Sequence, residues 1–472
     1  MEKSRGERWF WWALAICALF HIAHAGTLPI LVTYDGSEYV RLADLIHSPR
    51  FMEEYSFRRT PIYPLALKVA FKFFGRNPLG AQIPNLLFGF GGIALVALAL
   101  RRIGRPGLGA LCALMMTLDP VFVAYEHALL TEASSFFFVA LMLHVLLWKT
   151  LNPPLRTVLL GIAIALGFYQ RATLLYLAPI VAILVGGELL IREPQRGRAA
   201  WLRAAEHGIA VLLIPYALAY PWNRALANSN EANFGRQIVM YGALKQAVLP
   251  IDDPVLGPSK DAYRAAIGAC SPGGQLDLAG ISQAALQPVE YEMFARCGAD
   301  GFAVFWHALA SNPGGYVKGV GRCVLYFSGF PNNDSENRYY VRSVITEAGS
   351  GSKLQGTNHP LYPETARDFT QKTEGTLISR GLNRLYAIYN IFLPLGVFLS
   401  IAGFFIALWR KDFALAACTS LPLAILGMYT VALISVDRYV VPGYPLFIAN
   451  VLIVPALVYC RKKMEAREPA AS

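Results

Sequence analysis

Two carboxylates follow the first apolar segment of the chain, at positions that suit acid–base chemistry. The stretch YDGSEYVRLADLI, residues 34–46, carries Asp35 and Glu38, and Asp35 comes about four residues after that segment ends. A carboxylate held close to a membrane has reduced access to solvent, and such a group is suited to remove a proton from an acceptor hydroxyl as a general base. Taken alone, the stretch is explained as well by a solvated loop acid.

A second polar stretch, EHALLTE at residues 126–132, contains His127 and Glu132. Both side chains have atoms that bind metal ions or hydrogen-bond a hydroxyl. Glu132 equally suits the first turn of a helix, where the helix dipole favours an acid. No spacing here forms a firm metal motif, so we predict no metal site and no required cofactor, with a divalent cation as an alternative without support.

Two arginines interrupt apolar runs and have the chemistry to bind phosphate. Arg171 lies in GFYQRATLLYLAP, and Arg438 lies beside Asp437 in SVDRYVVPGYPL. A guanidinium donates two parallel hydrogen bonds to a phosphate, which makes arginine suited to a phosphate at a membrane surface. Two simpler interpretations remain, since Arg171 can extend toward water at the end of a hairpin and Arg438 can pair locally with Asp437.

Composition identifies the elements that must position these residues as membrane helices. The chain has 472 residues, of which 55% are hydrophobic and only 15% charged. A soluble domain carries about 25% charged residues. Apolar runs of about 20 residues recur along the sequence, as in transmembrane helices. The formal net charge of +11 arises largely in short loops between these runs, which argues against nucleic-acid binding.

The runs predict an all-α polytopic protein with about ten transmembrane helices. The predicted helices cover residues 9–31, 78–100, 108–125, 129–148, 157–169, 172–191, 207–222, 385–409, 413–435 and 440–460. With the N-terminus inside, the basic short loops all fall on the cytoplasmic side, as the positive-inside rule requires. Both termini are then expected to be cytoplasmic, and the residues singled out above are expected at the outer face.

The predicted domain organisation follows these helices. Residues 1–222 hold seven helices and a first outer loop at 32–75, which begins as a polar loop over 32–59. Residues 223–383 form one large extracytoplasmic loop region without a convincing span, including a polar flexible stretch at 347–360. Residues 384–472 hold three helices and a short cytoplasmic tail. Lysines four apart in residues 60–75, and spaced basic residues in 312–330, predict amphipathic helices lying on the outer face.

An acid and two arginines at one face of a helix bundle fit glycosyl transfer from a lipid-phosphate sugar. In such a reaction an acceptor oxygen attacks C1 of the sugar and the lipid phosphate leaves. A base takes the acceptor's proton, and cations stabilise the charge that develops on the phosphate. A lipid donor also explains why the charged residues lie at the edge of the bilayer rather than at its centre.

Six segments in order resemble the membrane-embedded C-type glycosyltransferases, most closely a bacterial branch related to protein O-mannosyltransferases and lipid A aminoarabinose transferase. The resemblance rests on DGSEYVRLA, RRTPIYPLAL, LLTEASSFFF, GFYQRATLLYLAP, SNPGGYVKGVGRCVLYF and DRYVVPGYPL. In the first of these, Tyr39 and Ala43 follow Asp35 at four-residue intervals. The segments extend from Asp35 to Leu446, so the resemblance covers most of the chain.

The resemblance implies roles for individual residues. Asp35 would be the catalytic base, and Arg171 and Arg438 would bind the donor phosphate. Other residues are expected to line the cavity, namely Glu38, Tyr39, Arg58, Arg59, Tyr63, His127, Glu132 and Tyr439. The chain departs from the family pattern at Gly36, where many members have Glu, so a paired-acid metal motif is absent. Ile62 replaces the usual Gly, and Ala172 replaces the usual Pro.

We therefore expect an integral enzyme of a bacterial inner membrane that moves a sugar from a polyprenyl-phosphate donor, with inversion, in an extracytoplasmic active site. The acceptor is a lipid, a glycan or a protein. A transporter or lipid flippase is the alternative from another class, but it requires ionisable groups at mid-membrane and usually an internal repeat. An oligosaccharide ligase with a lipid-diphosphate donor is a further alternative, since it also needs an acid and arginines near the outer face.

Overall fold

The computed structural model describes residues 2–192, 197–229, 231–232, 234–271, 276–297, 300–329, 335–346 and 376–465. Regular structure in these ranges is helical, apart from one isolated parallel bridge between Leu31 and Ala128. The chain divides into two compact units. The predicted all-α class is confirmed for the described part of the chain, and the predicted flexible stretch at 347–360 lies outside it.

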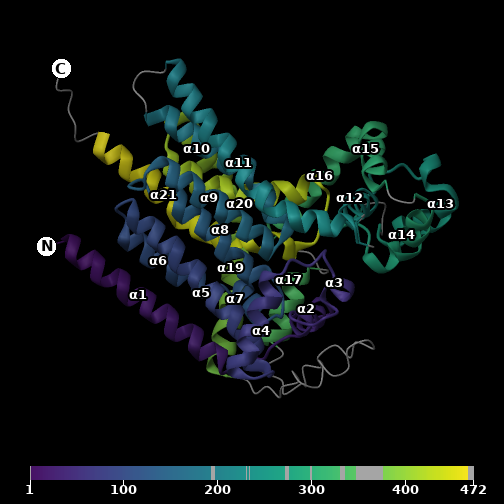
Figure 1. The fold of residues 1–472 in the computed structure, drawn as a ribbon, viewed down its shortest axis with the longest axis horizontal. Coiled ribbons are helices and arrows are strands. Elements are labelled where there is room, and N and C mark those ends of the chain that lie inside the picture. Colours follow the sequence, from purple (N-terminus) through teal and green to yellow (C-terminus); the bar gives the residue numbers. More distant parts are fainter. Residues whose placement is uncertain are drawn as a thin grey trace. The chain divides into compact units, whose positions relative to one another are not determined.

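The first unit comprises Met1–Tyr220, Tyr339–Ala424 and Val441–Ser472. Its helices, drawn in Figure 1, are α1 (Glu2–Ala25), α2 (Tyr34–Leu45), α3 (Phe51–Glu54), α4 (Ile62–Phe74), α5 (Pro78–Arg102), α6 (Pro106–Thr117), α7 (Pro120–Glu126), α8 (Glu132–Leu146), α9 (Pro153–Gln170), η1 (Ala172–Leu177), α10 (Ala178–Arg192), α11 (Arg198–Ala227), η4 (Arg342–Thr346), α19 (Leu377–Arg410), α20 (Phe413–Val431) and α21 (Tyr444–Glu465). Helix α5 contacts α1, α4, α6, α7 and α8, so it is central to this part of the first unit.

The second unit comprises Pro221–Arg338 and Ile425–Val440. Its helices are the end of α11, α12 (Phe234–Lys245), η2 (Pro254–Ser259), α13 (Lys260–Ala269), α14 (Gln283–Cys297), α15 (Gly301–Ser311), α16 (Pro313–Phe327), the first half of α17 (Glu336–Val341), the end of α20 and the start of η6 (Asp437–Gly443). Helix α16 confirms that the amphipathic segment predicted at 312–330 is helical. Within the described residues of 223–376, none of these helices is long and apolar enough to span a membrane.

All ten predicted spans contain helices, but fewer than ten meet the length and hydropathy of a membrane span. In the described residues six helical stretches do so, and the bent pair α6–α7 brings the count to seven. The three remaining predicted spans form α1, α8 and α9, of which α8 has only 15 residues. The protein is therefore an integral membrane protein. The total of ten spans and the assignment of each loop to one side of the membrane stay predictions.

Two local predictions are wrong. Residues 32–59 are not a polar loop, because they contain α2 and α3. Thr33 caps α2 by accepting a hydrogen bond from Gly36 N at 3.1 Å, and the buried Val40, Leu42 and Ala43 give the helix an apolar face. The span predicted at 108–125 is also broken, since α6 and α7 meet at an angle of 66°.

The break between α6 and α7 follows from the Asp119–Pro120 dipeptide. A residue before proline is pushed out of the helical region, and Asp119 has ψ 112. Its carboxylate then accepts a hydrogen bond from Val121 N at 3.0 Å and caps the new helix. The short α7 therefore changes direction and ends at Glu126, close to residues that follow α1.

A buried apolar cluster fixes α2 against α4 and α5. It consists of Ile30, Val32, Tyr39, Val40, Ala43, Tyr63, Leu67, Ala81 and Leu129. The interfacial helix predicted at residues 60–75 is confirmed as helix α4, and Tyr63 and Leu67 on it are fully buried. This cluster holds the polar first turn of α2 in one place, which is the main requirement for a site built on Asp35.

Candidate active site

Asp35 and Glu38 lie on one face of α2, because they are three residues apart in a helix. The Asp35 side chain is 16% exposed and that of Glu38 is 7% exposed. Gly36 lies between them against the turn that follows α7, where a Cβ atom would be only 2.8 Å from the Cβ and carbonyl oxygen of Leu129. The Glu that many family members carry at this position therefore has no room here.

Arg59 joins the two carboxylates. Its Nη2 donates to Asp35 Oδ1 at 2.5 Å, and its Nε donates to Glu38 Oε2 at 2.8 Å. Burial disfavours the charged guanidinium, but the oxygens of Tyr39, Asp35 and Glu38 outweigh it and raise the pKa of Arg59. Arg59 is therefore a permanent cation that orients the Asp35 carboxylate. A carboxylate has about four lone-pair sites, and the hydrogen bond from Arg59 occupies one of those of Asp35.

Arg58 and two tyrosines complete this group. Arg58 Nη2 donates to both oxygens of Glu38, at 3.1 and 3.3 Å. The guanidinium of Arg59 lies 5.2 Å from the centre of the Tyr39 ring, and that ring packs edge-on against Tyr63 at 5.1 Å. Burial raises the pKa of the Tyr39 phenol, which thus stays neutral. Six of the predicted site residues are therefore brought together.

Packed aromatic rings precede Arg58 and Arg59 in the chain. Phe51 and Tyr55 have ring centres 4.7 Å apart, and Phe57 packs edge-on against both. These rings lie in the segment between α2 and α4, which carries Arg58 and Arg59 at its end. A short segment packed in this way presents its last side chains in a fixed direction, since close-packed aromatic groups have few alternative rotamers.

Glu132 and Arg171 form a second ion pair. Arg171 Nη1 is 3.0 Å from Glu132 Oε1, and the Glu132 side chain is 3% exposed. Glu132 is the first residue of α8, and Arg171 occupies the break after α9, so the predicted interruption at Arg171 is confirmed. The charge of Glu132, like that of Asp35, acts on the Tyr39 phenol. This pair is therefore electrostatically coupled to the group around Asp35.

Arg438 and Tyr439 belong to the second unit. Arg438 Nε lies 3.3 Å from Glu336 Oε2, and its guanidinium is 5.3 Å from the centre of the Tyr439 ring. The preceding residues are held firmly, since Ser435 Oγ accepts from Gln246 Nε2 at 2.9 Å and donates to Ala279 O at 2.7 Å. Within this unit Arg438 is thus positioned by a carboxylate outside its own loop.

His127 is completely buried and does not line an open surface. Its Nδ1 is 3.0 Å from Pro29 O, and its Nε2 is 2.8 Å from His24 Nδ1. Burial lowers the pKa of His127 to about 3, so the ring is neutral. The backbone on either side pairs with Leu31, whose N donates to His127 O at 2.8 Å and whose O accepts from Leu129 N at 3.0 Å. The structure therefore makes His127 a positioning residue for the segment that leads to Asp35.

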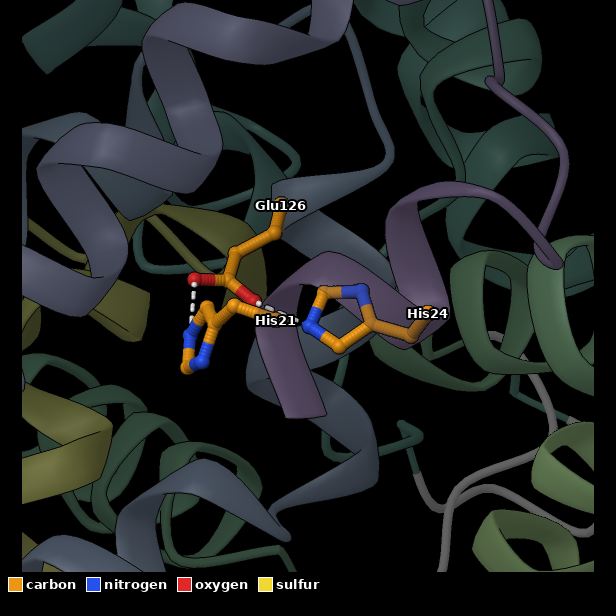
Figure 2. A group of neighbouring side chains, drawn as sticks. All are labelled: His21, His24 and Glu126. Carbon is orange, nitrogen blue, oxygen red and sulfur yellow. Dashed lines mark hydrogen bonds and ion pairs between the residues drawn. The ribbon is translucent and has the colours of Figure 1, made fainter. Parts of the chain in front are cut away.

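Sequence reasoning missed a cluster of buried ionisable side chains next to His127. Figure 2 shows the Glu126 carboxylate between the imidazole rings of His21 and His24. The three side chains are at most 5% exposed. The pattern HIAH in an apolar helix was a signal for it, since histidines three apart share one helix face. Glu126 is about a hundred residues away in the sequence, so spacing alone does not connect it to them.

A comparison with protein-family models matches residues 58–227 to the family described as dolichyl-phosphate-mannose-protein mannosyltransferase. The matched region begins at Arg58 and includes Glu132 and Arg171. The match covers about a third of the chain, and this region resembles that mannosyltransferase family. No curated protein sequence matches this chain.

Two solved structures resemble the chain distantly. ArnT from Cupriavidus metallidurans, bound to undecaprenyl phosphate, is 14% identical with a TM-score of 0.39, over 98% of this chain and 81% of that chain. The archaeal oligosaccharyltransferase AglB from Archaeoglobus fulgidus, in complex with an inhibitory peptide and a dolichol-phosphate, is 15% identical with a TM-score of 0.47, over 99% of this chain and 52% of that chain.

The two carboxylates on α2 have different surroundings. Asp35 is the more exposed of the two α2 carboxylates, whereas Glu38 is enclosed by Arg58 and Arg59. Asp35 therefore has the more accessible carboxylate, and Glu38 pairs with two arginines. Arg171 adds a guanidinium with five donors, so its ion pair to Glu132 does not preclude a second anionic partner.

Proposed function

We propose that this membrane protein is a glycosyltransferase that moves a sugar from a polyprenyl-phosphate donor to an acceptor hydroxyl, with inversion at the anomeric carbon and Asp35 as general base. The observation that carries the proposal is the Asp35 carboxylate, oriented by Arg59 in the first turn of α2 beside the region matched by the mannosyltransferase family. The family description supports a lipid-phosphate sugar as the donor class.

The proposed reaction is a single displacement. The acceptor oxygen bonds to C1 of the sugar while the bond from C1 to the phosphate oxygen breaks. The acceptor proton passes to an Asp35 oxygen, and the lipid phosphate leaves with one more negative charge. We assign Arg171 and Arg438 to the donor phosphate, where a guanidinium stabilises the charge that develops. Attack opposite the leaving group inverts the configuration at C1.

Several finer features belong to the same proposal. The active site faces the extracytoplasmic side of a bacterial inner membrane, and both termini are cytoplasmic, as the basic short loops indicate. The acceptor is a lipid, a glycan or a protein. Tyr63 and Tyr439 are assigned to the walls of the cavity, Tyr63 beside Tyr39 and Tyr439 beside Arg438.

Transfer by the purified protein tests the proposal. A panel of polyprenyl-phosphate sugars is offered to detergent-solubilised protein, product mass identifies the transferred sugar, and NMR gives its anomeric configuration. Asp35→Asn is expected to lower kcat by roughly 10²- to 10⁴-fold, the usual contribution of a general base. The matched control is Asp44→Asn on the same helix, where a half-exposed carboxylate pairs with Arg76 at 3.2 Å.

The control is expected to keep transfer within about twofold of the parent, because an exposed pair contributes little. Full transfer by a folded Asp35→Asn protein would refute the assignment of the base. A product with retained configuration would refute the single displacement. Absence of transfer with every lipid-phosphate sugar, together with transfer from lipid-diphosphate sugars, would assign the chain to the ligase class instead.

A further inference from the structure

The cluster formed by His21, His24 and Glu126 has the dimensions of a metal site. His21 Nε2 is 3.1 Å from Glu126 Oε1, and His24 Nε2 is 3.5 Å from Glu126 Oε2. One potential ligand atom from each residue lies within 4.8 Å of the others (Figure 2). All three residues are in the first unit, two on α1 and one at the end of α7.

The hydrogen-bond partner of His21 Nδ1 shows which ring nitrogen of His21 has the lone pair. His21 Nδ1 lies 2.8 Å from Cys17 O, and a carbonyl oxygen only accepts hydrogen bonds. Nδ1 therefore carries the proton. In a neutral imidazole the other nitrogen then has a lone pair, so His21 Nε2 presents that lone pair to the Glu126 carboxylate.

The contact between His24 and His127 likewise shows which ring nitrogen of His24 has the lone pair. His127 Nδ1 lies 3.0 Å from Pro29 O, which only accepts, so Nδ1 donates there and in a neutral ring His127 Nε2 accepts. The amide nitrogen of Gln82 lies 2.7 Å from Nδ1 and 2.8 Å from Nε2, and it can donate to the latter. The contact of 2.8 Å between His127 Nε2 and His24 Nδ1 then requires that His24 donates. His24 Nε2 is left with a lone pair directed at Glu126 Oε2, and both of these buried atoms have no hydrogen-bond partner.

Two nitrogen lone pairs thus face two oxygens of a buried carboxylate, and a positive species between them removes the repulsion. A zinc ion bound at about 2.0–2.2 Å from N and O ligands holds its donor atoms roughly 3.3–3.5 Å apart in a tetrahedral site. The spacings of 3.1 and 3.5 Å, each to a different oxygen of Glu126, are close to these dimensions, and one ligand atom per residue lies within 4.8 Å of the others. Two histidines and one glutamate form a ligand set that zinc sites use, and they leave the fourth position open.

We propose that His21, His24 and Glu126 bind a divalent transition-metal ion of the Zn²⁺ class. The surroundings are those of a metal site, since each ligand histidine donates its other N–H, to Cys17 O or to His127. The ion joins α1 to the end of α7 and holds the segment from Pro29 to Leu31 that leads to Asp35. Its role is to position that segment, and the proposal does not depend on the sugar-transfer reaction.

Metal analysis of the full-length protein tests the proposal. Protein purified in detergent from zinc-supplemented cells is expected to contain about one Zn²⁺ per chain. His24→Asn and Glu126→Gln are expected to weaken Zn²⁺ binding by at least about 100-fold. The matched control is His144→Asn, which removes another buried histidine, one that accepts from Arg102 Nε at 3.1 Å on α8. The control is expected to keep its metal.

Cobalt substitution gives a second readout that does not depend on the variants. Co²⁺ added to metal-free parent protein is expected to give the visible absorption of a tetrahedral site with nitrogen and oxygen ligands. Parent protein that binds neither Zn²⁺ nor Co²⁺ would overturn the proposal and show that the cluster holds protons only. Equal metal content in the parent, His24→Asn and Glu126→Gln proteins would place the ion elsewhere and overturn it as well.

Discussion

The ion pair between Arg59 and Asp35 is expected to contribute measurably to stability because it is largely shielded from water. Their side chains are 18% and 16% exposed, and the two atoms are 2.5 Å apart. A hydrogen bond to a charged group contributes about 1.5–3 kcal/mol when buried, and we take the lower part of this range because the pair is not fully enclosed. We therefore expect a coupling free energy of about 1.5–2 kcal/mol between the two side chains.

A double-mutant cycle measures this coupling. The parent, Arg59→Met, Asp35→Asn and the double variant are unfolded with denaturant in mixed micelles, and the free energy of unfolding is followed by circular dichroism. The non-additive part of the four values is the coupling free energy. Arg59→Met alone is expected to cost more than the coupling, since Glu38 also loses a partner at 2.8 Å and keeps only Arg58.

An exposed pair in the same segment is the control. Arg50 Nη1 is 3.1 Å from Glu54 Oε1, with side chains 72% and 39% exposed. The cycle of Arg50→Met and Glu54→Gln is expected to give about 0.5 kcal/mol or less, as exposed helix pairs do. The reasoning is refuted if the coupling of Arg59 to Asp35 is no larger than that of the control, because burial is the main difference between the two pairs.

Three further predictions concern single residues. Gly36→Ala places a Cβ atom 2.8 Å from the carbonyl oxygen of Leu129 and is expected to lower the free energy of unfolding by about 1–3 kcal/mol, measured by thermal unfolding. The control is Gly107→Ala, which has nothing within 4 Å of the added Cβ and is expected to leave the stability unchanged in the same assay. Glu132→Gln replaces the buried carboxylate that pairs with Arg171 and is expected to cost about 2 kcal/mol by denaturant unfolding. Arg438→Ala is expected to raise the KM for the lipid-phosphate donor about tenfold and to leave the acceptor KM nearly unchanged, which steady-state transfer kinetics measure.

Each of these has an outcome that contradicts it. Equal stability of Gly36→Ala and Gly107→Ala would show that α2 shifts freely away from the turn after α7. A Glu132→Gln protein as stable as the parent would show that Arg171 does not depend on that carboxylate. Equal changes in the donor and acceptor KM values of Arg438→Ala would remove Arg438 from the donor phosphate.

Long apolar runs predicted most of the helices, because a helix in a membrane is specified mainly by the length and hydropathy of its own residues. The break at Arg171 was predictable for the same reason, since a charged residue between two apolar runs marks an end. Helix α2 was not predictable from such runs, because it is short and polar at its start. Its stability depends on Tyr39, Val40 and Ala43, which pack on residues distant in the sequence. The bend between α6 and α7 depends on the two residues Asp119 and Pro120 inside one apolar run.

The features of the site also divide into those that the sequence predicted and those that it did not. Asp35 and the arginines were predictable as ionisable residues at the ends of apolar runs. Arg59 and Glu132 were expected in the same cavity, but the ion pairs were not predictable, because Arg59 is 24 residues from Asp35 and Arg171 is 39 residues from Glu132. Glu38 illustrates the difference, since the sequence places it only among the residues expected to line the cavity, whereas the structure makes it the acceptor of two guanidinium groups.

The contacts that join the residues after α1 to the turn after α7 also set a time for their assembly. His24 and His127 are 103 residues apart in the chain. At a synthesis rate of about 5–20 residues per second, roughly 5–20 s pass between the production of these two histidines. During that interval His21 and His24 on α1 lack the partners Glu126 and His127, and α2 lacks the Leu129 turn beside Gly36. The segment that carries Asp35 is thus made early and acquires its final position only after α7 has been synthesised.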